Sequence, residues 1–539
     1  MSKLPRLAIA GLVAGATLVS TAWAGVGLAP VRTATSADDT GPLGDAGAEV
    51  TETVTAVAEE GSPAGGLLAG ASKVSIEPKP DLYDGYWETD PDKCRTLDPA
   101  AFEQLQADPN GHGAHYVTAG GSPWPENPNC LYMGGYGIGP MNPITSWDQE
   151  YGLWVRSFAL GDGTDTMVLT IIDAEGYLWD YRNKCAVDDD CGSKQIAEEL
   201  GAELGLEPSS FVIAATHSHT APDLIGGWGF VPDWYMRQVG DAIRQSIREA
   251  VGSMQEAVVE IGEVEARSHN RERRDTYRSA EEQQLTWLRA TTAHGPKETI
   301  ATVGAYAGHP TTRDAGSGVA HADWPATFEK ALETRFGGIG LHFMTGLGNM
   351  SAAGGTMMGD RLAQLVPEIG GGRELTGRDL AVGQVRWAQP VTNVPLDALG
   401  TPGFFDREFL LEPSQVRTGK SPDTAPCLSA SPSTVELPVS AFRIGDELAI
   451  TAAPGEVFSN LTNTLKEQSG AAVTMPLGQA NDALGYMPQS FELHPVAQQG
   501  LGFVAGGVLI VNYEDSYAVD RCVGDMVLEQ TIQLVRSIT

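Results

Sequence analysis

Short apolar runs alternate with turns rich in glycine and proline from about residue 67 to the end of the chain. The runs with the length and β-branched content of strands are Met167–Ile172, Phe211–Ala215, Ala301–Ala307, Leu341–Met344, Glu436–Phe442, Glu447–Ala452 and Ala472–Pro476. Apolar residues recur at helical spacing in Ser193–Leu204, Trp234–Ser253, Trp324–Phe336 and Gly455–Gln468. The mixture predicts a mixed α/β (α+β) fold, in which layered, mixed β-sheets are flanked by helices in one large domain, residues 70–539.

The first residues of the chain are typical of an export signal rather than of a folded element. Lys3 and Arg6 precede the apolar run Leu7–Ala22, and an Ala-Trp-Ala motif follows, so we expect a secretory signal peptide, residues 1–24, cleaved after Ala24. An uncleaved membrane anchor is the alternative, but a bilayer needs about 20 strongly apolar residues. Residues 25–69 are rich in Ala, Gly, Thr and acidic residues and contain no aromatic residue. We expect them to form a disordered spacer.

The chain has 6 cysteines, and an even number fits disulfide bonds in an exported protein. Cys185 and Cys191 enclose a short acidic loop and are the favoured local pair. The pairs Cys94–Cys130 and Cys427–Cys522 then follow by elimination. Two C-x-x-C motifs, as in a zinc ribbon, are absent from the sequence, so the cysteines do not predict a metal site.

Charge and composition narrow the class of function. With 35 Lys and Arg against 69 Asp and Glu, the net charge is −34, so the chain repels phosphate backbones and we expect no nucleic-acid partner. Hydrophobic residues make up 42%, which is ordinary for a globular protein. Beyond the N-terminal run, no apolar stretch is long enough for a transmembrane segment. These features predict a secreted, extracellular protein.

Two histidines directly follow one of the predicted strands. Phe211–Ala215 leads into Thr216-His217-Ser218-His219, and residues i and i+2 of an extended chain point to the same face. His217 and His219 can therefore address one cavity, and open α/β sheets bind ligands beyond the carboxyl ends of their strands. Taken alone, the pattern is as typical of structural histidines as of a metal site.

Further polar residues follow other predicted strands. They are His309, Ser351, Glu456 and Tyr486. Each also has a structural interpretation: a turn histidine, a serine in a tight glycine-rich turn, an acid that complements the dipole of a helix's first turn, and a core tyrosine. The residue types alone leave both interpretations open.

Five short motifs, taken in their order along the chain, resemble the neutral ceramidase family. They are HSHTAP, AGHPTT, LGNMSAAGG, ELPVSAFRIGDELAITAAPGEVF and NDALGYMP. The family pattern is H-T-H-S-x-P, a histidine at a strand end, L-G-D-V-S-P-N, P-G-E, and Gly-Tyr after an Asn-containing strand end. The similarity extends over roughly Leu67 to Thr539 and is concentrated in these motifs.

The resemblance implies a zinc-dependent amide hydrolase with one Zn²⁺ per chain. It assigns His217, His309, Glu456 and Tyr486 as metal ligands, Ser351 as the serine next to the scissile amide, and His219 as a histidine beside the metal that could shuttle a proton. Two imidazoles and a carboxylate are a common zinc set, and bound water becomes a nucleophile near neutral pH. The implied reaction cleaves an N-acyl amide, ceramide-like or another N-acyl lipid, to a fatty acid and an amine.

The sequence departs from the family mainly where a substrate would be contacted. In the Ser351 motif, Asn349 replaces Asp and Ala352-Ala353 replaces Pro-Asn. His309 is followed by Pro-Thr-Thr instead of x-Thr-Ser, and His321-Ala-Asp323-Trp-Pro replaces an Asp-Asn-Lys-Gly run. Arg156 is a loose match to an arginine of the family, and we expect the family's C-terminal immunoglobulin-like domain to be missing. The resemblance therefore implies a zinc hydrolase more directly than it implies ceramide as the substrate.

Two other functions fit parts of the sequence. A serine-dependent esterase or lipase would use Ser351 or another serine as nucleophile, but the chain has no G-x-S-x-G motif. A non-catalytic secreted binding protein could lack a metal ligand, whereas all the positions that match the family's ligands are filled. A small amphiphilic substrate suits this acidic protein better than an anionic polymer, which it would repel. The acyl length, the amine and the oligomeric state stay open.

Overall fold

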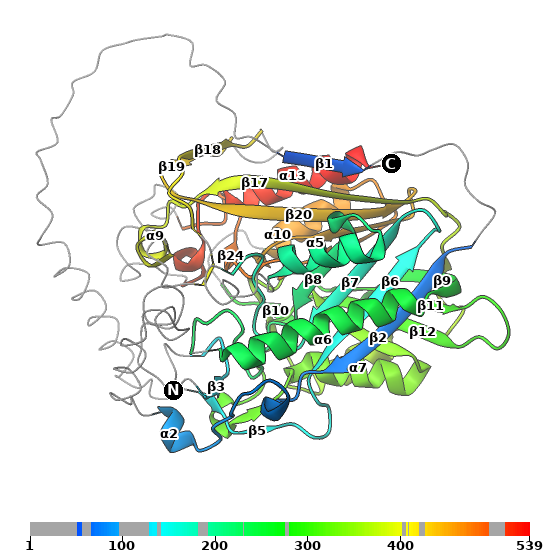
Figure 1. The fold of residues 1–539 in the computed structure, drawn as a ribbon. Coiled ribbons are helices and arrows are strands. Elements are labelled where there is room, and N and C mark those ends of the chain that lie inside the picture. Colours follow the sequence, from blue (N-terminus) through cyan, green and yellow to red (C-terminus); the bar gives the residue numbers. More distant parts are fainter. Residues whose placement is uncertain are drawn as a thin grey trace, which may run out of the picture.

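The computed structural model describes residues 51–55, 66–95, 129–136, 142–181, 192–229, 231–274, 280–400, 406–407, 409–419, 426–494 and 513–538 (Figure 1). Within these residues, two large β-sheets pack face to face and helices cover their outer faces. The layers therefore follow the order helices, sheet, sheet, helices. This arrangement confirms the predicted mixed α/β class with layered, mixed sheets.

The larger sheet has 9 strands, in the order β14-β12-β11-β9-β2-β6-β7-β8, with β16 paired to β9. Their bounds are β2 Leu68–Ser75, β6 Trp154–Gly161, β7 Thr166–Ile172, β8 Phe211–Ala215, β9 Gln255–Glu265, β11 Gln284–Thr292, β12 Thr299–Tyr306, β14 Ile339–Met344 and β16 Arg373–Glu374. The pairs β7–β8 and β12–β14 are parallel and the other pairs are antiparallel, so the sheet is mixed.

The smaller sheet has 5 strands in the order β1-β17-β20-β21-β23. Their bounds are β1 Thr51–Thr55, β17 Leu380–Pro390, β20 Thr434–Ile444, β21 Leu448–Ala452 and β23 Val473–Leu477. The long antiparallel pair β17–β20 runs in continuous register from Leu380↔Ile444 to Pro390↔Thr434. β21 and β23 are parallel.

Apolar side chains from both sheets fill the space between them. Phe158 and Leu169 of the larger sheet share this cluster with Phe442 and Ile450 of the smaller one. Because helices cover the opposite faces, several strands of both sheets are buried on both sides and consist mainly of apolar residues. For this reason β7, β8 and β21 are recognisable in the sequence as short apolar runs.

Helices form the two outer layers. α6 (Asp233–Gly252) packs on β2 and β6, α7 (Asp323–Phe336) on β14, α10 (Ser459–Gln468) on β23, and α13 (Val523–Ser537) on β17 and β20 (Figure 1). The other helices are α2 Pro91–Arg95, α5 Ser193–Leu204, α8 Met358–Leu365 and α9 Val394–Gly400, with short 3₁₀ turns at Pro80–Leu82, Pro208–Ser210, Ala315–Ser317 and Tyr513–Tyr517. None of the described helices has the length and apolarity needed to cross a bilayer.

Short strands form separate two-stranded sheets outside the two large ones and carry several candidate residues. They are β3 Leu131–Tyr132, β4 Pro143–Ile144, β5 Ser146–Trp147, β10 Asn270–Glu272, β13 Val319–Ala320, β15 Met350–Ala352, β18 Ser414–Arg417, β19 Leu428–Ser431, β22 Glu456–Val457 and β24 Tyr486–Met487. The predicted helix Gly455–Gln468 is wrong at its start, because the helix begins only at Ser459. The backbone N–H of Glu456 donates instead to Gly485 O at 2.8 Å, which holds β22 beside β24. Glu456 is therefore not an acid in the first turn of a helix.

The structure also differs from the expected disordered spacer, residues 25–69. Thr51–Thr55 forms β1, which pairs antiparallel with β17, and β2 begins at Leu68. Strand pairing uses the backbone and suits the β-branched sequence Thr-Glu-Thr-Val-Thr, so the lack of aromatic residues did not prevent it. Residues 1–50, including the predicted signal peptide, lie outside the described residues.

Two predicted disulfide bonds are confirmed. Cys94 bonds to Cys130 and Cys427 bonds to Cys522, with sequence separations of 36 and 95 residues. The second bond ties the segment before β19 to the residue that precedes α13. The favoured local pair, Cys185–Cys191, lies outside the described residues.

Candidate metal centre

His217 and His309 follow β8 and β12, and each is held by one hydrogen bond to a backbone carbonyl. Nδ1 of His217 lies 2.8 Å from Glu175 O, and Nδ1 of His309 lies 2.8 Å from Leu347 O. A carbonyl oxygen can only accept, so Nδ1 carries the proton in both rings. Nε2 of each neutral imidazole is then left with a lone pair, which is how a metal-binding histidine is usually prepared.

The carboxylate of Glu456 lies against both rings. Its Oε2 is 3.0 Å from Nε2 of His309 and 3.6 Å from Nε2 of His217, and all three side chains are buried. Within the described residues, neither Oε2 of Glu456 nor Nε2 of His309 has a hydrogen-bond partner. A carboxylate oxygen and an imidazole lone pair repel each other at this distance unless a proton or a cation lies between them. The donor set fits a metal ion.

The charges of these groups are strongly coupled. Burial lowers the pKa of His309 to about 4, and the positive charge of Arg273 adds to this effect. Burial also acts to lower the pKa of His217, but Glu456 outweighs it and raises the value to about 9. Burial opposes ionisation of Glu456, yet the two histidines hold its pKa well below the ordinary value. Without a metal, His217 therefore carries an additional proton at neutral pH, whereas His309 is neutral and Glu456 is ionised.

His219 completes a cluster of three histidines. Its Nε2 is 3.4 Å from Nε2 of His217, and one nitrogen from each of His217, His219 and His309 lies within 4.8 Å of the others. Burial, together with the neighbouring rings of His217 and His309, holds the pKa of His219 well below its usual value. Gly135, at φ 82°, lies so close that a Cβ there would be 2.1 Å from Nδ1 of His219. Glycine is thus required at this position.

Tyr486 approaches the cluster from β24, where it is in register with Glu456. Its ring stacks on His309 with the centroids 6.3 Å apart. Its hydroxyl oxygen accepts a hydrogen bond of 2.9 Å from Arg273. Arg273 also donates to Gly348 O and to Glu514, each at 2.9 Å. A cation held from three sides therefore fixes where the phenol oxygen lies.

Ser351 lies in β15, beside His309 but not within the histidine cluster. The two residues form a parallel β-bridge, and His309 N donates to Met350 O at 2.9 Å. Ser351 is partly buried, and its hydroxyl has no hydrogen-bond partner among the described residues. The structure thus brings all the predicted site residues to one region, with Ser351 at its edge.

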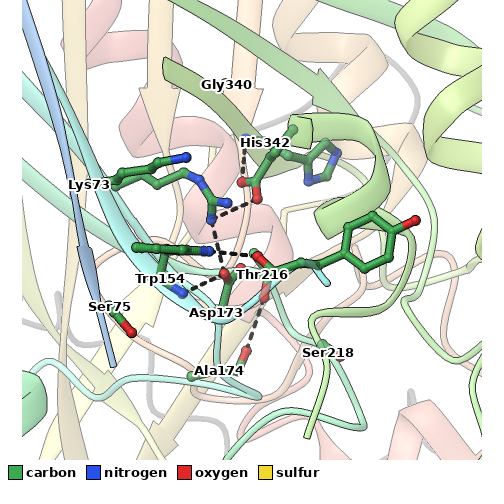
Figure 2. A network of polar contacts seen from close by, with 12 residues as sticks. Lys73, Ser75, Trp154, Asp173, Ala174, Thr216, Ser218, Gly340 and His342 are labelled. Atoms are coloured by element: carbon green, nitrogen blue, oxygen red, sulfur yellow. Dashed lines mark hydrogen bonds and ion pairs between the residues drawn. The ribbon is translucent and has the colours of Figure 1, made fainter. Parts of the chain in front are cut away.

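Arg156 belongs to a separate buried network (Figure 2). Its Nη1 is 2.9 Å from Asp173 and 2.8 Å from Glu329. Asp173 also accepts from Trp154 N at 2.8 Å, and Thr216 lies next to this network. Arg156 thus ties β6 and β7 to α7 behind the segment that carries His217, which is a scaffold role.

Sequence reasoning missed two residues of the centre. Glu175 accepts from His217 through its backbone, and its carboxyl Oε1 lies 3.6 Å from the same Nδ1. Burial raises the pKa of Glu175 to about 8. It follows β7 just as His217 follows β8, so the strand-end rule could have found it. Arg273 gave no such signal, because it stands in a run of charged residues, Arg271 to Arg274, that is typical of a surface.

Asn349, which departs from the family pattern, has a structural role. Its Oδ1 accepts from Ser459 N at 2.8 Å and from Ser459 Oγ at 2.9 Å, at the start of α10. Its Nδ2 donates to Ala280 O at 3.1 Å. An aspartate could not make the last bond, so asparagine suits this environment.

Comparison with known proteins finds similarity in structure rather than in sequence. No model of a known protein family and no curated protein matches the chain. The crystal structure of neutral ceramidase from Pseudomonas aeruginosa superimposes with a TM-score of 0.55 at 14% identity, over 87% of this chain and 74% of that one. A structure of a ceramidase complexed with C2 gives a TM-score of 0.53 at 14% identity, over 88% and 75%. At this identity the likeness concerns the fold: the chain has the fold of these ceramidase structures.

Proposed function

We propose that this protein is a secreted, zinc-dependent amidohydrolase that cleaves an N-acyl amide to a fatty acid and an amine. The observation that carries the proposal is the 3.0 Å approach of His309 Nε2 to Glu456 Oε2, two buried acceptors without another partner among the described residues. A divalent cation between them relieves their repulsion. His217, His309, Glu456 and Tyr486 would hold it, with one Zn²⁺ per chain.

Zinc, when bound, supplies an activated water and polarises the carbonyl of the substrate. The chain's own residues perform the remaining tasks. Nδ1 of His217 and of His309 keeps its proton on a backbone carbonyl, so both rings stay oriented. Because His219 is neutral and adjacent to His217, its Nε2 can accept a proton and later deliver it to the nitrogen of the leaving amine.

Two further residues suit an amide that is bound at this centre. Arg273 is fixed on Tyr486 and is a cationic donor at the edge of the site, suited to developing negative charge on the carbonyl oxygen. Ser351, with a hydroxyl that has no hydrogen-bond partner in the described region, is available to orient the amide. An amine is a poor leaving group unless it is protonated, so these residues act together with His219.

The proposed substrate class follows from chemistry and from the fold. The two ceramidase structures share the fold, and ceramide, after which those enzymes are named, is an N-acyl amide. A net charge of −34 disfavours anionic polymers, so a small amphiphilic N-acyl amide, ceramide-like or another N-acyl lipid, is proposed. Secretion is supported by the predicted signal peptide and by two disulfide bonds.

The alternative of a serine-dependent esterase has less support. A serine nucleophile needs a base within hydrogen-bond reach, and Ser351 has no side-chain partner in the described part of the chain. A non-catalytic binding protein would not need a neutral histidine next to a metal set. The proposed amidohydrolase gives a role to Ser351, to the neutral His219 and to the metal ligands.

The test offers the purified full chain, loaded with zinc, a panel of short- and long-chain ceramides, N-acyl amino acids and matched esters. We expect release of fatty acid and amine that stops on chelation and returns with added zinc. His342→Ala serves as the matched variant, because His342 is a buried histidine outside the cluster. Turnover of esters alone, insensitive to chelation and abolished by Ser351→Ala, would overturn the proposal in favour of the esterase.

A further inference from the structure

The short segment from His321, after β13, to Asp323, the first residue of α7, contacts both loops that carry the histidine cluster. His321 N donates to Thr220 O at 2.8 Å, and His321 O accepts from Ser218 Oγ and Thr220 Oγ1, each at 2.8 Å. These bonds hold the loop of His217 and His219, which we call the first histidine loop, residues 216–220.

Asp323 holds the other loop, residues 309–313, which we call the second histidine loop. Its Oδ2 accepts from Thr312 N at 2.8 Å and from Arg313 N at 2.9 Å. Its Oδ1 accepts from Thr312 Oγ1 at 2.5 Å and from Trp324 N at 2.6 Å. The side chain is completely buried, so water does not compete for these bonds.

The two loops also touch each other directly, since His219 N donates to Pro310 O at 3.2 Å. Asp323 N donates to Nδ1 of His321 at 2.6 Å, which joins the two halves of the connection. One short segment, residues 321–323, is thus bonded to both histidine loops.

Backbone geometry supports a specific task for this segment. Asp323 has φ 59°, in the left-handed region that non-glycine residues rarely adopt, although aspartate and asparagine tolerate it better than most. Such a conformation persists only where its surroundings determine it, and it is common at functional sites. The segment ends at the first residue of α7, in which Glu329 is bound to Arg156 and accepts from His342 N. α7 is therefore bonded to both β6 and β14.

We propose that Asp323 is a positioning residue, which fixes the second histidine loop against the first and so sets the spacing of His217, His219 and His309. The inference rests on the proposed function in treating His217 and His309 as metal ligands and His219 as the histidine beside the metal. The bonds of Asp323 to the second loop do not depend on it.

A matched control exists at Asp520. This aspartate is also completely buried and accepts from Gln389 Nε2, Thr392 Oγ1, Ser429 Oγ and Cys522 N. None of these partners lies in either histidine loop. Asp323→Asn and Asp520→Asn each replace one acceptor oxygen with a donor, and asparagine tolerates the left-handed backbone of residue 323 as aspartate does. The two variants therefore differ in which segments they release.

The first readout is hydrogen exchange of the metal-free full chain, followed on peptides that cover the two histidine loops. We expect Asp323→Asn to speed exchange at Thr312 and Arg313, and at His219, by about 10-fold or more, while Asp520→Asn leaves these amides unchanged. Wild-type exchange in both loops of Asp323→Asn would overturn the proposal, whether or not the protein binds metal.

The second readout is the visible absorption of Co²⁺ added to the same proteins, which reports the geometry of the ligands. We expect Asp323→Asn to alter the Co²⁺ spectrum and to weaken binding by about 10–100-fold, with Asp520→Asn like the wild type. Faster exchange with an unchanged spectrum and affinity would show that the loops move without moving the imidazoles, and the proposal would be wrong. Wild-type protein that binds no Co²⁺ would instead contradict the proposed function, and the exchange result would still decide whether Asp323 fixes the loops.

Discussion

Nε2 of His309 and Oε2 of Glu456 face each other at 3.0 Å although both are hydrogen-bond acceptors. A cation between them removes the conflict, so loss of either partner should release the metal. We expect His309→Ala and Glu456→Gln to weaken zinc binding beyond the roughly 10–100-fold typical of losing an outer partner. Equilibrium titration with zinc measures this. His342→Ala should lower the melting temperature through its cavity but keep stoichiometric zinc, and equal zinc loss in all variants would refute the assignment.

Metal binding should release a proton from His217. In the metal-free protein Glu456 raises the pKa of His217 to about 9, whereas the pKa of His309 is about 4. At pH 7 His217 is therefore protonated and His309 is neutral, and only neutral imidazole binds metal. The logarithm of the zinc affinity should rise by about one per pH unit from pH 7 towards pH 9 and then level off. Calorimetry in buffers of different ionisation enthalpy should count about one proton released at pH 7, and a count of zero would contradict the protonation of His217 in the metal-free protein.

The same ionisations affect the stability of the metal-free protein. His217 has a raised pKa, so its stabilising interaction with Glu456 is complete below about pH 6.5 and is lost as pH rises through about 9. Glu456 has a lowered pKa, so its contribution is lost only in acid. Denaturant unfolding should show that His217→Ala removes the decrease in stability between pH 6.5 and 9 that the metal-free wild type shows. A parallel decrease in both proteins would assign the effect elsewhere.

Ser351 distinguishes the two hydrolase mechanisms by magnitude. If it orients the amide, Ser351→Ala should lower kcat by about 10–100-fold and leave zinc binding intact, because the hydroxyl is not among the metal ligands. Removal of a true nucleophile costs on the order of a million-fold in kcat. Steady-state kinetics on the preferred amide therefore distinguishes an orienting serine from a nucleophilic one. A fall in kcat of about a million-fold with zinc still bound would favour the serine mechanism.

Arg273 should influence the reaction as a cationic donor to the developing charge on the carbonyl oxygen. Its bonds to Tyr486, Gly348 and Glu514 fix a cation at the edge of the centre. We expect Arg273→Ala to lower kcat/KM by about 100-fold, in the range seen when one oriented donor is removed. Arg248→Ala removes an exposed arginine that pairs with Glu203 on the surface and should leave kcat/KM unchanged. Equal activity in both variants would exclude Arg273 from the site.

The apolar runs predicted β7, β8, β12, β14, β20, β21 and β23, because burial on both faces leaves a continuous apolar signal in strands such as β7, β8 and β21. The middle strands of the larger sheet, β11, β9, β2 and β6, carry polar residues among the apolar ones and were not predicted. His217 and His309 were also recognisable as candidates, because ligands bind beyond the carboxyl ends of strands and a predicted strand precedes each of them. The start of α10 was not predictable, because Glu456 is held by Gly485 from a distant segment. Arg273 was not predicted for the same reason, because its partner Tyr486 is far away in the sequence. Asp323 was not predicted because it is bonded to a loop, residues 309–313, whose path an apolar pattern does not indicate.

The expectation of a disordered spacer did not hold for residues 51–55, for a different reason. Composition alone suggested that residues 51–55 could not fold, but a strand added to the edge of an existing sheet needs only backbone partners, which β17 supplies. Composition describes what a segment can bury by itself, not what a neighbouring edge can stabilise.

The register of β22 with β24 has a consequence for the order of folding. Glu456 and Tyr486 lie at the candidate metal site because β22 pairs with β24. His217 and His309 instead follow β8 and β12 of the larger sheet. Because these contacts join segments far apart in the sequence, we expect the candidate metal site to form late in folding. In refolding experiments, zinc uptake should lag behind the recovery of secondary structure and mark the molecules in which both sheets have docked.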